Sequence, residues 1–276
     1  MDIRELRDRT QGAPAANSER GPTRGETLSD PRLTPTSVAA GPATPLRLHI
    51  LPGVFRPRSD AELAARVLAR HRLVVGADVL DLFTGSGVLA ISAARLGARS
   101  VTAVDLSRRA QLSTRWNARR NGVTLQALRG DLFAPVNGRR FDVIVANPPY
   151  LPGGDELPRR GAARAWEGGP EGRTLVDRLI DGAPRHLRDA GVLVIVQSSL
   201  TGEELTMQRL AEHGLGPEVL TRHRGPLGPL ARARADRLRA IGALEADDDR
   251  EEVLVIGARR SAREAQPHSP APCAAA

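Results

Sequence analysis

The tetrapeptide Asn147-Pro148-Pro149-Tyr150 follows an apolar stretch and carries the most informative chemistry in the chain. The nitrogen of an amide or of an aromatic amine is a poor nucleophile, because its lone pair is delocalised. Two acceptors aimed at its N–H groups, the Asn147 side-chain oxygen and the Pro148 carbonyl, would orient that lone pair toward an electrophile. The prolines stiffen the turn, and Tyr150 offers a flat face for stacking. The alternative is a turn that only ends a strand, which these residue types also favour.

A glycine-rich turn follows another apolar stretch, DVLDLF, at residues 78–83. Its residues Thr84, Gly85 and Gly87 allow a tight turn and a close approach of the backbone to a ligand. The helix predicted after it would begin with free N–H groups and a partial positive charge. A dinucleotide site uses the same geometry for a pyrophosphate, so the turn alone does not identify its ligand.

Three acidic residues accompany that turn. Asp81 precedes it, where a carboxylate would repel phosphates but suits a cationic aminoacyl group. Asp105 lies 20 residues after Gly85, where an acid can accept hydrogen bonds from ribose hydroxyls. Asp131 is placed to take the exocyclic amine of adenine, with Leu132 supplying a backbone N–H and an apolar contact. Taken singly, Asp105 could cap a helix and Asp131 could be a turn residue. Together the three carboxylates describe S-adenosylmethionine better than NAD.

Apolar strands alternating with amphipathic helices predict an α/β fold in which a mostly parallel sheet is covered on both faces. Ligands of such sheets bind beyond the carboxyl ends of the strands, and every candidate site lies at such an end. Ser59 or Asp60 is expected to cap the first helix, and Ser107 the third. The predicted helices are 60–71, 88–96, 107–121, 172–187 and 203–213. The predicted strands are 78–83, 100–105, 123–128, 141–146, 191–197, 215–224 and 251–258.

Composition limits the class of protein. Hydrophobic residues make up 41 % of the 276 residues, enough for a core, and there is neither an 18-residue apolar run nor an apolar signal segment at the N-terminus. The one cysteine, Cys273, can form no internal disulfide and no cysteine-based metal site, which favours the cytoplasm. The net charge of +8 comes from arginine alone. We favour the bias of a GC-rich genome over RNA or ribosome binding as its cause.

The chain divides into a central domain and two tails. Residues 1–45 and 260–276 are rich in small and polar residues and are expected to be disordered. Residues 46–259 form the predicted domain. Within it, residues 225–250 interrupt the last two strands with helical spacing of Ala, Arg and Leu. A solvated surface helix is the favoured interpretation of this insertion, and a contact for a substrate or partner is the alternative.

These motifs resemble the HemK/PrmC group of class I methyltransferases, which methylate the glutamine of the GGQ motif in peptide-chain release factors. The resemblance covers roughly residues 48–258. It extends to VFRPRSDAE at 54–62, similar to the family's PR/PxxDTE segment, and to WEGGPEGR at 166–173, similar to EGGxDG. It implies a Rossmann-like, mostly parallel seven-stranded sheet with an antiparallel last strand. The short form without a helical front domain is closest to the HemK-related methylases, including eukaryotic and archaeal release-factor methyltransferases.

The resemblance also implies residue roles. Asn147 to Tyr150 match the clamp for the substrate glutamine. The chain departs from the family in two places. Residues 1–45 cannot supply the helical domain that grips the release factor in long-form enzymes, and Ala61 replaces a threonine, which removes a possible hydroxyl contact to the cofactor. The expected cofactor contacts are Asp81, Thr84, Gly85, Gly87, Asp105, Asp131, Leu132 and Asn147.

The leading functional hypothesis is therefore an S-adenosylmethionine-dependent protein-(glutamine-N5) methyltransferase acting on a release factor. An RNA or DNA base methyltransferase, acting on adenine N6 or guanine N2, uses the same tetrapeptide. Further alternatives are a small-molecule N-methyltransferase and a non-enzymatic cofactor-binding partner, against which the intact tetrapeptide argues. A dinucleotide oxidoreductase would leave Asn147 unexplained. The expected partner is a release factor or another macromolecule, with RNA as an alternative, without a membrane and with an activating partner unidentified.

Overall fold

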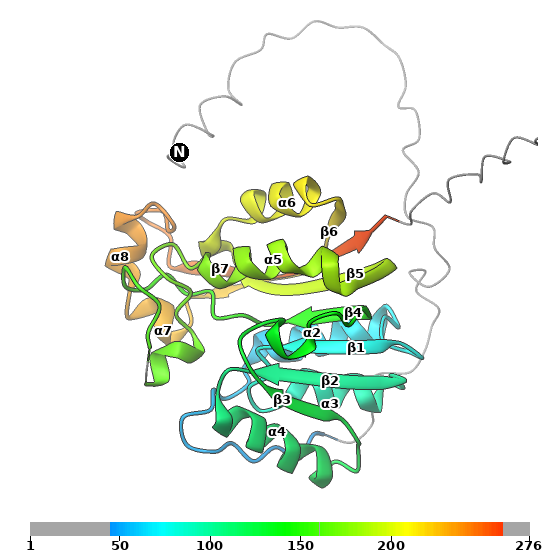
Figure 1. The fold of residues 1–276 in the computed structure, drawn as a ribbon. Helices are drawn as coiled ribbons and strands as arrows, with labels where there is room; N and C mark the ends of the chain where they lie inside the picture. Colours follow the sequence, from blue (N-terminus) through cyan, green and yellow to red (C-terminus); the bar gives the residue numbers. More distant parts are fainter. Residues whose placement is uncertain (1–44, 160, 262–276) are drawn as a thin grey trace, which may run out of the picture.

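The computed structural model describes residues 45–159 and 161–261, and these form a sheet covered by helices on both faces (Figure 1). The seven strands have the order β3-β2-β1-β4-β5-β7-β6. Within the described chain, β7 alone runs antiparallel to its neighbours β5 and β6. The predicted sheet with an antiparallel last strand is therefore confirmed. The predicted tails lie outside the described residues, except for positions 45, 260 and 261, of which Arg260 still belongs to the last strand.

The elements follow the predicted order. The strands are β1 (Asp78–Leu82), β2 (Ser100–Asp105), β3 (Gln126–Arg129), β4 (Phe141–Ala146), β5 (Leu187–Ser198), β6 (Leu215–Pro226) and β7 (Arg250–Arg260). The helices are α2 (Ser59–Arg70), α3 (Val88–Arg95), α4 (Arg108–Arg120), α5 (Thr174–His186), α6 (Glu203–Glu212), α7 (Pro229–Arg232) and α8 (Ala235–Ala240). Short 3-10 helices are η1 (Ala134–Val136), η2 (Ala162–Ala165) and η3 (Ser199–Thr201).

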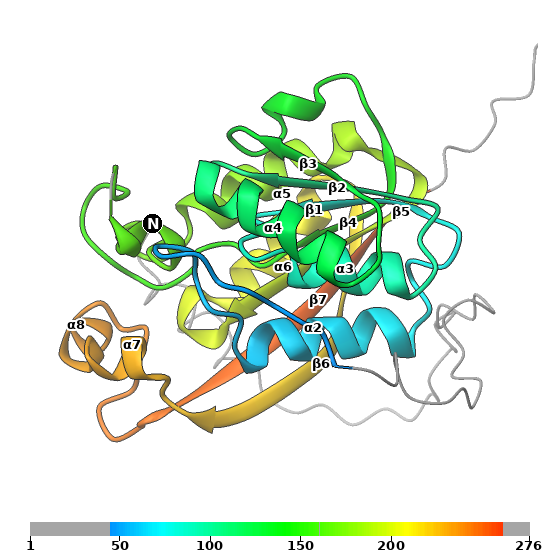
Figure 2. The ribbon, with the colours of Figure 1, turned by 90° about the horizontal axis from the view of Figure 1, so that it is seen from below.

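Alternation along the strands divides the interior into two cores. Side chains of successive strand residues point to opposite faces, so Leu80 and Leu82 of β1 pack in the core of α5 and α6, and Val79 packs in the core of α2 and α3. Figures 1 and 2 show α5 and α6 on one side of the sheet and α2, α3 and α4 on the other. Asp81 has the parity of Val79 and therefore faces the start of α3.

Three local predictions need correction. β5 begins at Leu187, four residues before the predicted start, because Leu187 is fully buried and pairs with Phe141 ahead of an irregularity in the ladder. β3 is shorter than predicted and starts at Gln126. Neither Ser59 nor Asp60 is the N-cap of α2, because both residues are already helical. The N-cap is Arg58, which makes no side-chain cap hydrogen bond, and among the described residues Asp60 Oδ1 accepts only from the N–H of its neighbour Ala61. The predicted cap of α4 is confirmed, since the Ser107 side chain accepts from the Ala110 N–H at 3.3 Å.

The insertion between β6 and β7 is not a solvated helix. It forms the two short helices α7 and α8, which lie beyond one end of the sheet (Figures 1 and 2). Its residues Leu227, Leu238 and Leu244 are buried because they have partners from the body of the domain. This small third core consists of Leu151, Leu200, Leu227, Ala231, Leu238 and Leu244.

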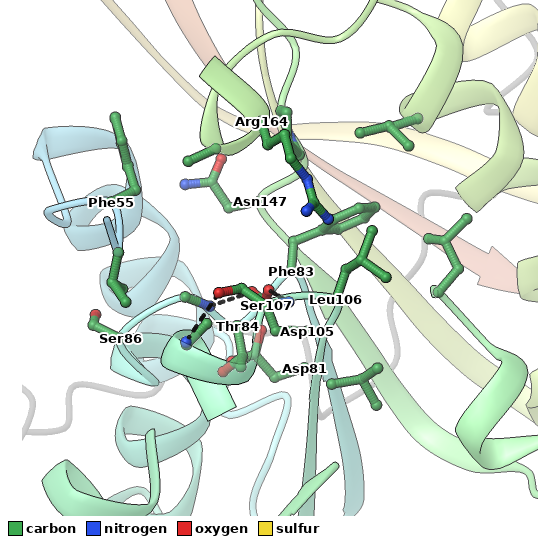
Figure 3. Close-up of a pocket in the computed structure, with 18 of the residues that line it drawn as sticks. Phe55, Asp81, Phe83, Thr84, Ser86, Asp105, Leu106, Ser107, Asn147 and Arg164 are labelled. Atoms are coloured by element: carbon green, nitrogen blue, oxygen red, sulfur yellow. Dashed lines mark hydrogen bonds between the residues drawn. The ribbon is translucent and has the colours of Figure 1, made fainter. Parts of the chain in front are cut away.

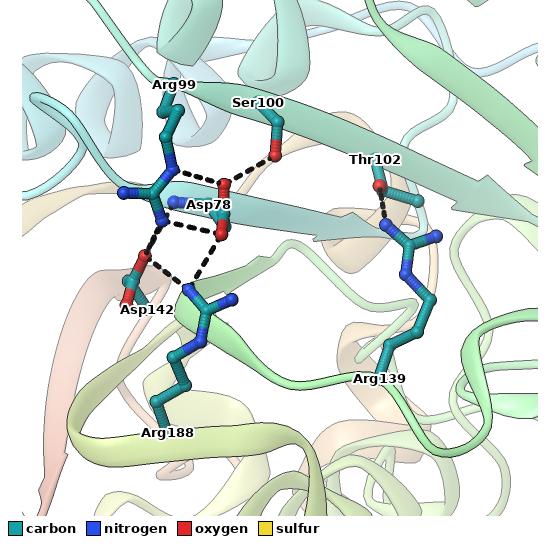
Figure 4. Close-up of polar contacts among 7 residues, drawn as sticks. All are labelled: Asp78, Arg99, Ser100, Thr102, Arg139, Asp142 and Arg188. Atoms are coloured by element: carbon teal, nitrogen blue, oxygen red, sulfur yellow. Dashed lines mark hydrogen bonds and ion pairs between the residues drawn. The ribbon is translucent and has the colours of Figure 1, made fainter.

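The amino-terminal ends of the parallel strands are joined by charges (Figure 4). Arg99 donates to Asp78 at 2.6 and 2.9 Å and to Asp142 at 3.1 Å, and Arg188 bridges the same two carboxylates at 2.7 and 2.8 Å. Hydrogen bonds from Arg99 hold the pKa of Asp78 well below its usual range. This network fixes the end of the sheet opposite the candidate site. Among the described residues, no helix combines the length and the apolar character that a membrane crossing requires.

Candidate functional site

A cavity of about 270 Å³ opens beyond the carboxyl ends of β1, β2 and β4. The glycine-rich turn and the first residues of α4 form one wall, and Asn147 and Arg164 lie across the space from Asp105 and Thr84 (Figure 3). The cavity therefore lies where a parallel sheet of this topology binds ligands. Predicted residues in its lining are Asp81, Thr84, Gly85, Asp105, Asp131, Leu132, Asn147 and Pro149.

Asp81 ties the glycine-rich turn to helix α3. Its Oδ2 accepts from the Thr84 hydroxyl at 2.6 Å and from the Ala90 N–H at 3.0 Å. Its Oδ1 is buried and has no partner among the described residues. Burial raises the pKa of Asp81 to about 7, against the two hydrogen bonds that lower it. A buried carboxylate oxygen without a donor favours binding of a cationic or hydrogen-bond-donating ligand group, because each such atom costs free energy until it is paired.

The two glycines of the turn have different roles. Gly85 has a φ of 55° and lines the cavity, so its backbone approaches any ligand there. Gly87 has a φ of 86° but does not line the cavity, and a Cβ on it would lie 2.9 Å from the Thr114 Cγ2. Gly87 therefore serves the close packing of α3 against α4, a role that the sequence motif does not distinguish from ligand binding.

Asp105 closes the other side of the turn. Its Oδ2 accepts from the Gly85 N–H at 2.9 Å and its Oδ1 from the Ser107 N–H at 2.8 Å. Burial raises its pKa, and the two backbone hydrogen bonds oppose that rise. A carboxylate oxygen has two lone pairs, so each oxygen retains acceptor capacity for a hydroxyl in the cavity. Asp105 is not the cap of α4, which is Ser107, but it holds the cap residue through the Ser107 N–H.

Asp131 lies at the rim of the cavity, where its Oδ2 accepts from Arg178 of α5 at 2.7 Å. About half of each side chain is exposed, so the pair can rearrange at little cost. Leu132 follows with a φ of 46°, an uncommon backbone conformation for leucine. Arg178 could not be predicted as a partner of Asp131, because it lies 47 residues away on another element.

The charge of the cavity fits the predicted cofactor. Five carboxylates line it, against the two arginines Arg164 and Arg178. An excess of acidic groups favours a cationic ligand and disfavours a pyrophosphate. S-adenosylmethionine carries groups that match these features. Its cationic aminoacyl and sulfonium part fits the unpaired Oδ1 of Asp81 and the partly exposed backbone of Gly85, and its ribose fits the free lone pairs of Asp105. The five carboxylates belong to Asp60, Asp81, Asp105, Asp131 and Glu167.

Asp60 orients the tetrapeptide that follows β4. The Asn147 Nδ2 donates to Asp60 Oδ2 at 3.0 Å, and the Tyr150 hydroxyl donates to the same oxygen at 3.3 Å. Asp60 is buried, and its Oδ1 accepts from the Ala61 N–H at 2.7 Å. A carboxylate offers only acceptors, so the NH₂ end of the Asn147 amide must face Asp60 and the oxygen must face away from it. Burial raises the pKa of Tyr150 well above 10.0, which keeps its hydroxyl a donor.

A second cavity, of about 340 Å³, meets the first at this tetrapeptide. Asp60, Asn147 and Pro149 line both cavities, whereas Pro148 and Tyr150 line the second alone. The far wall of the second cavity comes from Trp166 and from the insertion, residues 225–231. A donor in the first cavity and an acceptor in the second would therefore meet at Asn147.

The segment from Trp166 to Arg173 holds the tetrapeptide in place. Leu151 N–H donates to the Trp166 carbonyl and Gly168 N–H to the Leu151 carbonyl, both at 2.9 Å. A Cβ on Gly168 would lie 2.6 Å from the Pro149 carbonyl oxygen, so only glycine permits this approach. Arg173 is buried and donates to the Thr201 carbonyl at 2.6 Å. The insertion contacts this segment through Arg234, which forms an ion pair with Glu167 at 2.8 Å.

Asp60 is the site residue that reasoning from the sequence assigned wrongly, as a helix cap. The available signal was the segment VFRPRSDAE, in which an acid follows one proline and two arginines at the start of a helix. Its role is visible only after folding, because Asn147 lies 87 residues further along the chain.

The comparisons with known proteins agree with this geometry. The methyltransferase small domain family matches residues 45–162. A relative from Methanocaldococcus jannaschii, named as a protein N5-glutamine methyltransferase, is 37 % identical over 194 residues, which is 70 % of this chain and 96 % of the relative. The release factor glutamine methyltransferase of Gloeobacter violaceus is 36 % identical over 160 residues, 54 % of this chain. The chain spans 56 % of the length of that longer bacterial relative.

A solved structure extends the likeness to three dimensions. It is the E. cuniculi Mtq2-Trm112 complex, described as responsible for methylation of the eRF1 translation termination factor. The TM-score is 0.54 with 26 % sequence identity, over 76 % of this chain and 99 % of that one. With an archaeal relative matched over almost its whole length, the chain belongs to the HemK/PrmC group of class I, S-adenosylmethionine-dependent methyltransferases.

Proposed function

We propose that the chain transfers a methyl group to the side-chain amide nitrogen of a glutamine, in the GGQ motif of a peptide-chain release factor. The observation that carries the proposal is the position of Asn147, which lines both cavities and donates to Asp60. Its amide oxygen is left to accept a hydrogen bond from an acceptor nitrogen. The names of the archaeal and bacterial relatives support glutamine as the group that bears this nitrogen.

In this proposal, Asp81, Thr84, Gly85, Asp105, Asp131 and Leu132 hold the cofactor, and Gly87 supports the turn from behind. S-adenosylmethionine, when bound, supplies an electrophilic methyl group. The pairing of Asp81 with Thr84 and Ala90 occupies one carboxylate oxygen and leaves the other, which is buried, without a partner among the described residues; attraction to a cation is stronger at a buried carboxylate than at an exposed one.

Asn147 and Pro148 act on the acceptor. A primary amide has two N–H groups, and the Asn147 side-chain oxygen and the Pro148 carbonyl each accept one of them. Both acceptors lie on a stiff turn, so the amide plane is fixed and the nitrogen lone pair is directed toward the donor. Tyr150 packs against the acceptor while its hydroxyl stays bound to Asp60. Transfer would form the N–C bond as the S–C bond of the bound sulfonium breaks, with the thioether as leaving group. The methylated nitrogen would then be acidic and lose its surplus proton to water, so no general base is required beforehand.

The test is transfer of label from tritiated S-adenosylmethionine to purified release factors of the organism that encodes the chain. Each release factor is assayed beside the same protein with alanine in place of the GGQ glutamine. Label on the intact factor and none on the alanine form is the expected result. Label that appears in RNA or small molecules of a fractionated extract, and on no release factor, would reject the proposal.

The same assay also tests whether the chain needs an activating partner protein. The E. cuniculi relative was solved with Trm112, so the assay is repeated with added cell extract from which small molecules have been removed. An increase in the rate with extract indicates an activating partner. We expect the reaction to take place in the cytoplasm, where release factors work.

A further inference from the structure

The outward face of helix α4 is strongly basic and carries an exposed aromatic ring. Trp116 is 52 % exposed and Leu112, one turn earlier, is 47 % exposed. Side chains three and four positions apart are neighbours on a helix, so the Trp116 ring lies among arginines. The helix is at the outer edge of the molecule, beside the edge strand β3 (Figure 1). The exposed arginines of α4 are Arg108, Arg109, Arg115, Arg119 and Arg120.

Nothing in the described chain neutralises these charges. Residues 106–130 contain six arginines and no acidic residue. Arg109 and Arg115 donate to the neutral carbonyls of Pro52 and Ala127, at 3.2 and 2.9 Å, which directs their guanidinium groups without cancelling the charge. The side chains of Arg119 and Arg120 make neither an ion pair nor a hydrogen bond with any described residue.

An arginine-rich composition does not explain this face. The other described helices with more than one arginine also contain acids: Asp60 and Glu62 in α2, Asp177 and Asp181 in α5, and Asp236 in α8. In α4 two arginines occupy the first turn, where the helix dipole disfavours positive charge. A bias in composition would add arginine without removing acids from one helix.

We propose that the α4 face, defined as Arg108, Arg109, Arg115, Trp116, Arg119 and Arg120, binds RNA. The guanidinium groups would contact phosphates, and an unpaired base would stack on the Trp116 ring. Single-stranded nucleic acid is bound by this combination of cationic groups and aromatic faces. The inference is independent of the proposed function, because the face lies on the outside of α4 and its residues are absent from the lining of both cavities.

The experiment measures the anisotropy of a fluorescein-labelled 20-nucleotide single-stranded RNA of mixed sequence, titrated with the full chain between 50 and 300 mM salt. Binding should weaken steeply with salt, because each phosphate contact releases counterions. The double variant Arg119→Glu/Arg120→Glu should lose about tenfold or more in affinity and have a shallower salt slope. The matched control, Arg66→Glu/Arg70→Glu on the exposed side of α2, makes the same change in charge and should bind almost as the parent does.

Trp116→Ala separates RNA from other anions. It should weaken RNA binding about five- to a hundredfold, the range for loss of one stacked base, and should leave binding of polyglutamate unchanged. Absence of RNA binding at 50 mM salt would overturn the proposal, and so would equal losses in the two charge variants. Polyglutamate binding as tight as that of RNA, with no effect of Trp116→Ala on RNA, would assign the face to an acidic protein instead. Methylation of the release factor by these variants reports on the proposed function separately.

Discussion

Asn147 donates from its Nδ2 to Asp60 Oδ2 at 3.0 Å, across 87 residues of sequence. Asp60 is buried in the first turn of α2, whereas Asn147 directly follows the central strand β4. The contact selects one of the two orientations of the Asn147 amide, because a carboxylate can accept but not donate. A residue outside the tetrapeptide therefore decides which atom of the Asn147 amide faces away from Asp60.

Loss of that orientation should cost turnover and spare cofactor binding. We expect Asp60→Ala to lower kcat by about 10²-fold, the scale of a misplaced reacting group, since the freed amide can rotate and offer NH₂ instead of oxygen. Asp60→Asn should recover much of the loss, because an amide oxygen can still accept from Asn147. Steady-state kinetics with the release factor and calorimetry with S-adenosylhomocysteine measure the two effects. An equal fall in kcat in both variants, or no fall in kcat in Asp60→Ala, would contradict the positioning role.

Substitutions on the substrate side and on the cofactor side of the site should have different kinetic effects. Asn147→Ala removes an acceptor for the substrate and should reduce kcat by about 10²-fold or more, with cofactor affinity nearly unchanged. Asp105→Ala removes a charged acceptor for the ribose, and also the carboxylate that binds the Gly85 N–H. It should mainly raise the cofactor KM, by about tenfold or more. Equal losses of cofactor affinity in the two variants would contradict these roles.

The sheet and the cofactor side of the site follow from local sequence. Asp81, Gly85 and Asp105 can be placed because each follows an apolar stretch whose length indicates a buried strand, and the ends of parallel strands converge. The prediction fails where long-range contacts override local preference. Leu187 pairs with Phe141, and this extends β5 back over residues 187–190, which include Asp189, a residue type that indicates a turn.

The acceptor side was harder to predict because it is assembled from distant segments. Asp60, Asn147 and Trp166 meet only in the folded chain. The insertion has the arginine content of a solvated helix, but Leu238 and Leu244 are buried beside Leu151. Helical spacing alone cannot show that such leucines have partners elsewhere in the chain.

Cofactor affinity should depend on pH through Asp81, whose pKa burial raises to about 7. Its folded pKa is above the usual value for aspartate, so the unliganded protein holds a proton there at mildly acidic pH. The ammonium group of the ligand's aminoacyl part prefers the carboxylate, so binding expels that proton. Affinity for S-adenosylhomocysteine should therefore rise as pH increases through 7, with binding up to about tenfold weaker at pH 6 than at pH 8.

Calorimetry in two buffers of different ionisation enthalpy should detect release of the proton at pH 6 to 7. Asp81→Asn is the control. It should bind more weakly at every pH, and the part of the pH dependence that comes from Asp81 should disappear. Equal affinity of the parent at pH 6 and pH 8 would show that Asp81 does not face the cation.

Gly168 should be irreplaceable because its close contact with the Pro149 carbonyl holds the backbone of the tetrapeptide Asn147–Tyr150 in place. A Cβ at this position would lie 2.6 Å from the Pro149 carbonyl oxygen, closer than van der Waals contact allows, so Gly168→Ala must displace the backbone next to Pro148. We expect a fall in kcat of about 10²-fold with nearly unchanged S-adenosylhomocysteine affinity, and a destabilisation of about 1–3 kcal/mol from overpacking. Gly154→Ala is the matched control, since its Cβ would meet nothing closer than the Glu156 carbonyl at 3.9 Å. It should retain activity and melting temperature. Thermal melts of both variants distinguish a displaced tetrapeptide from an unfolded chain. Parent-like turnover by a folded Gly168→Ala variant would show that the position of the tetrapeptide does not depend on this contact.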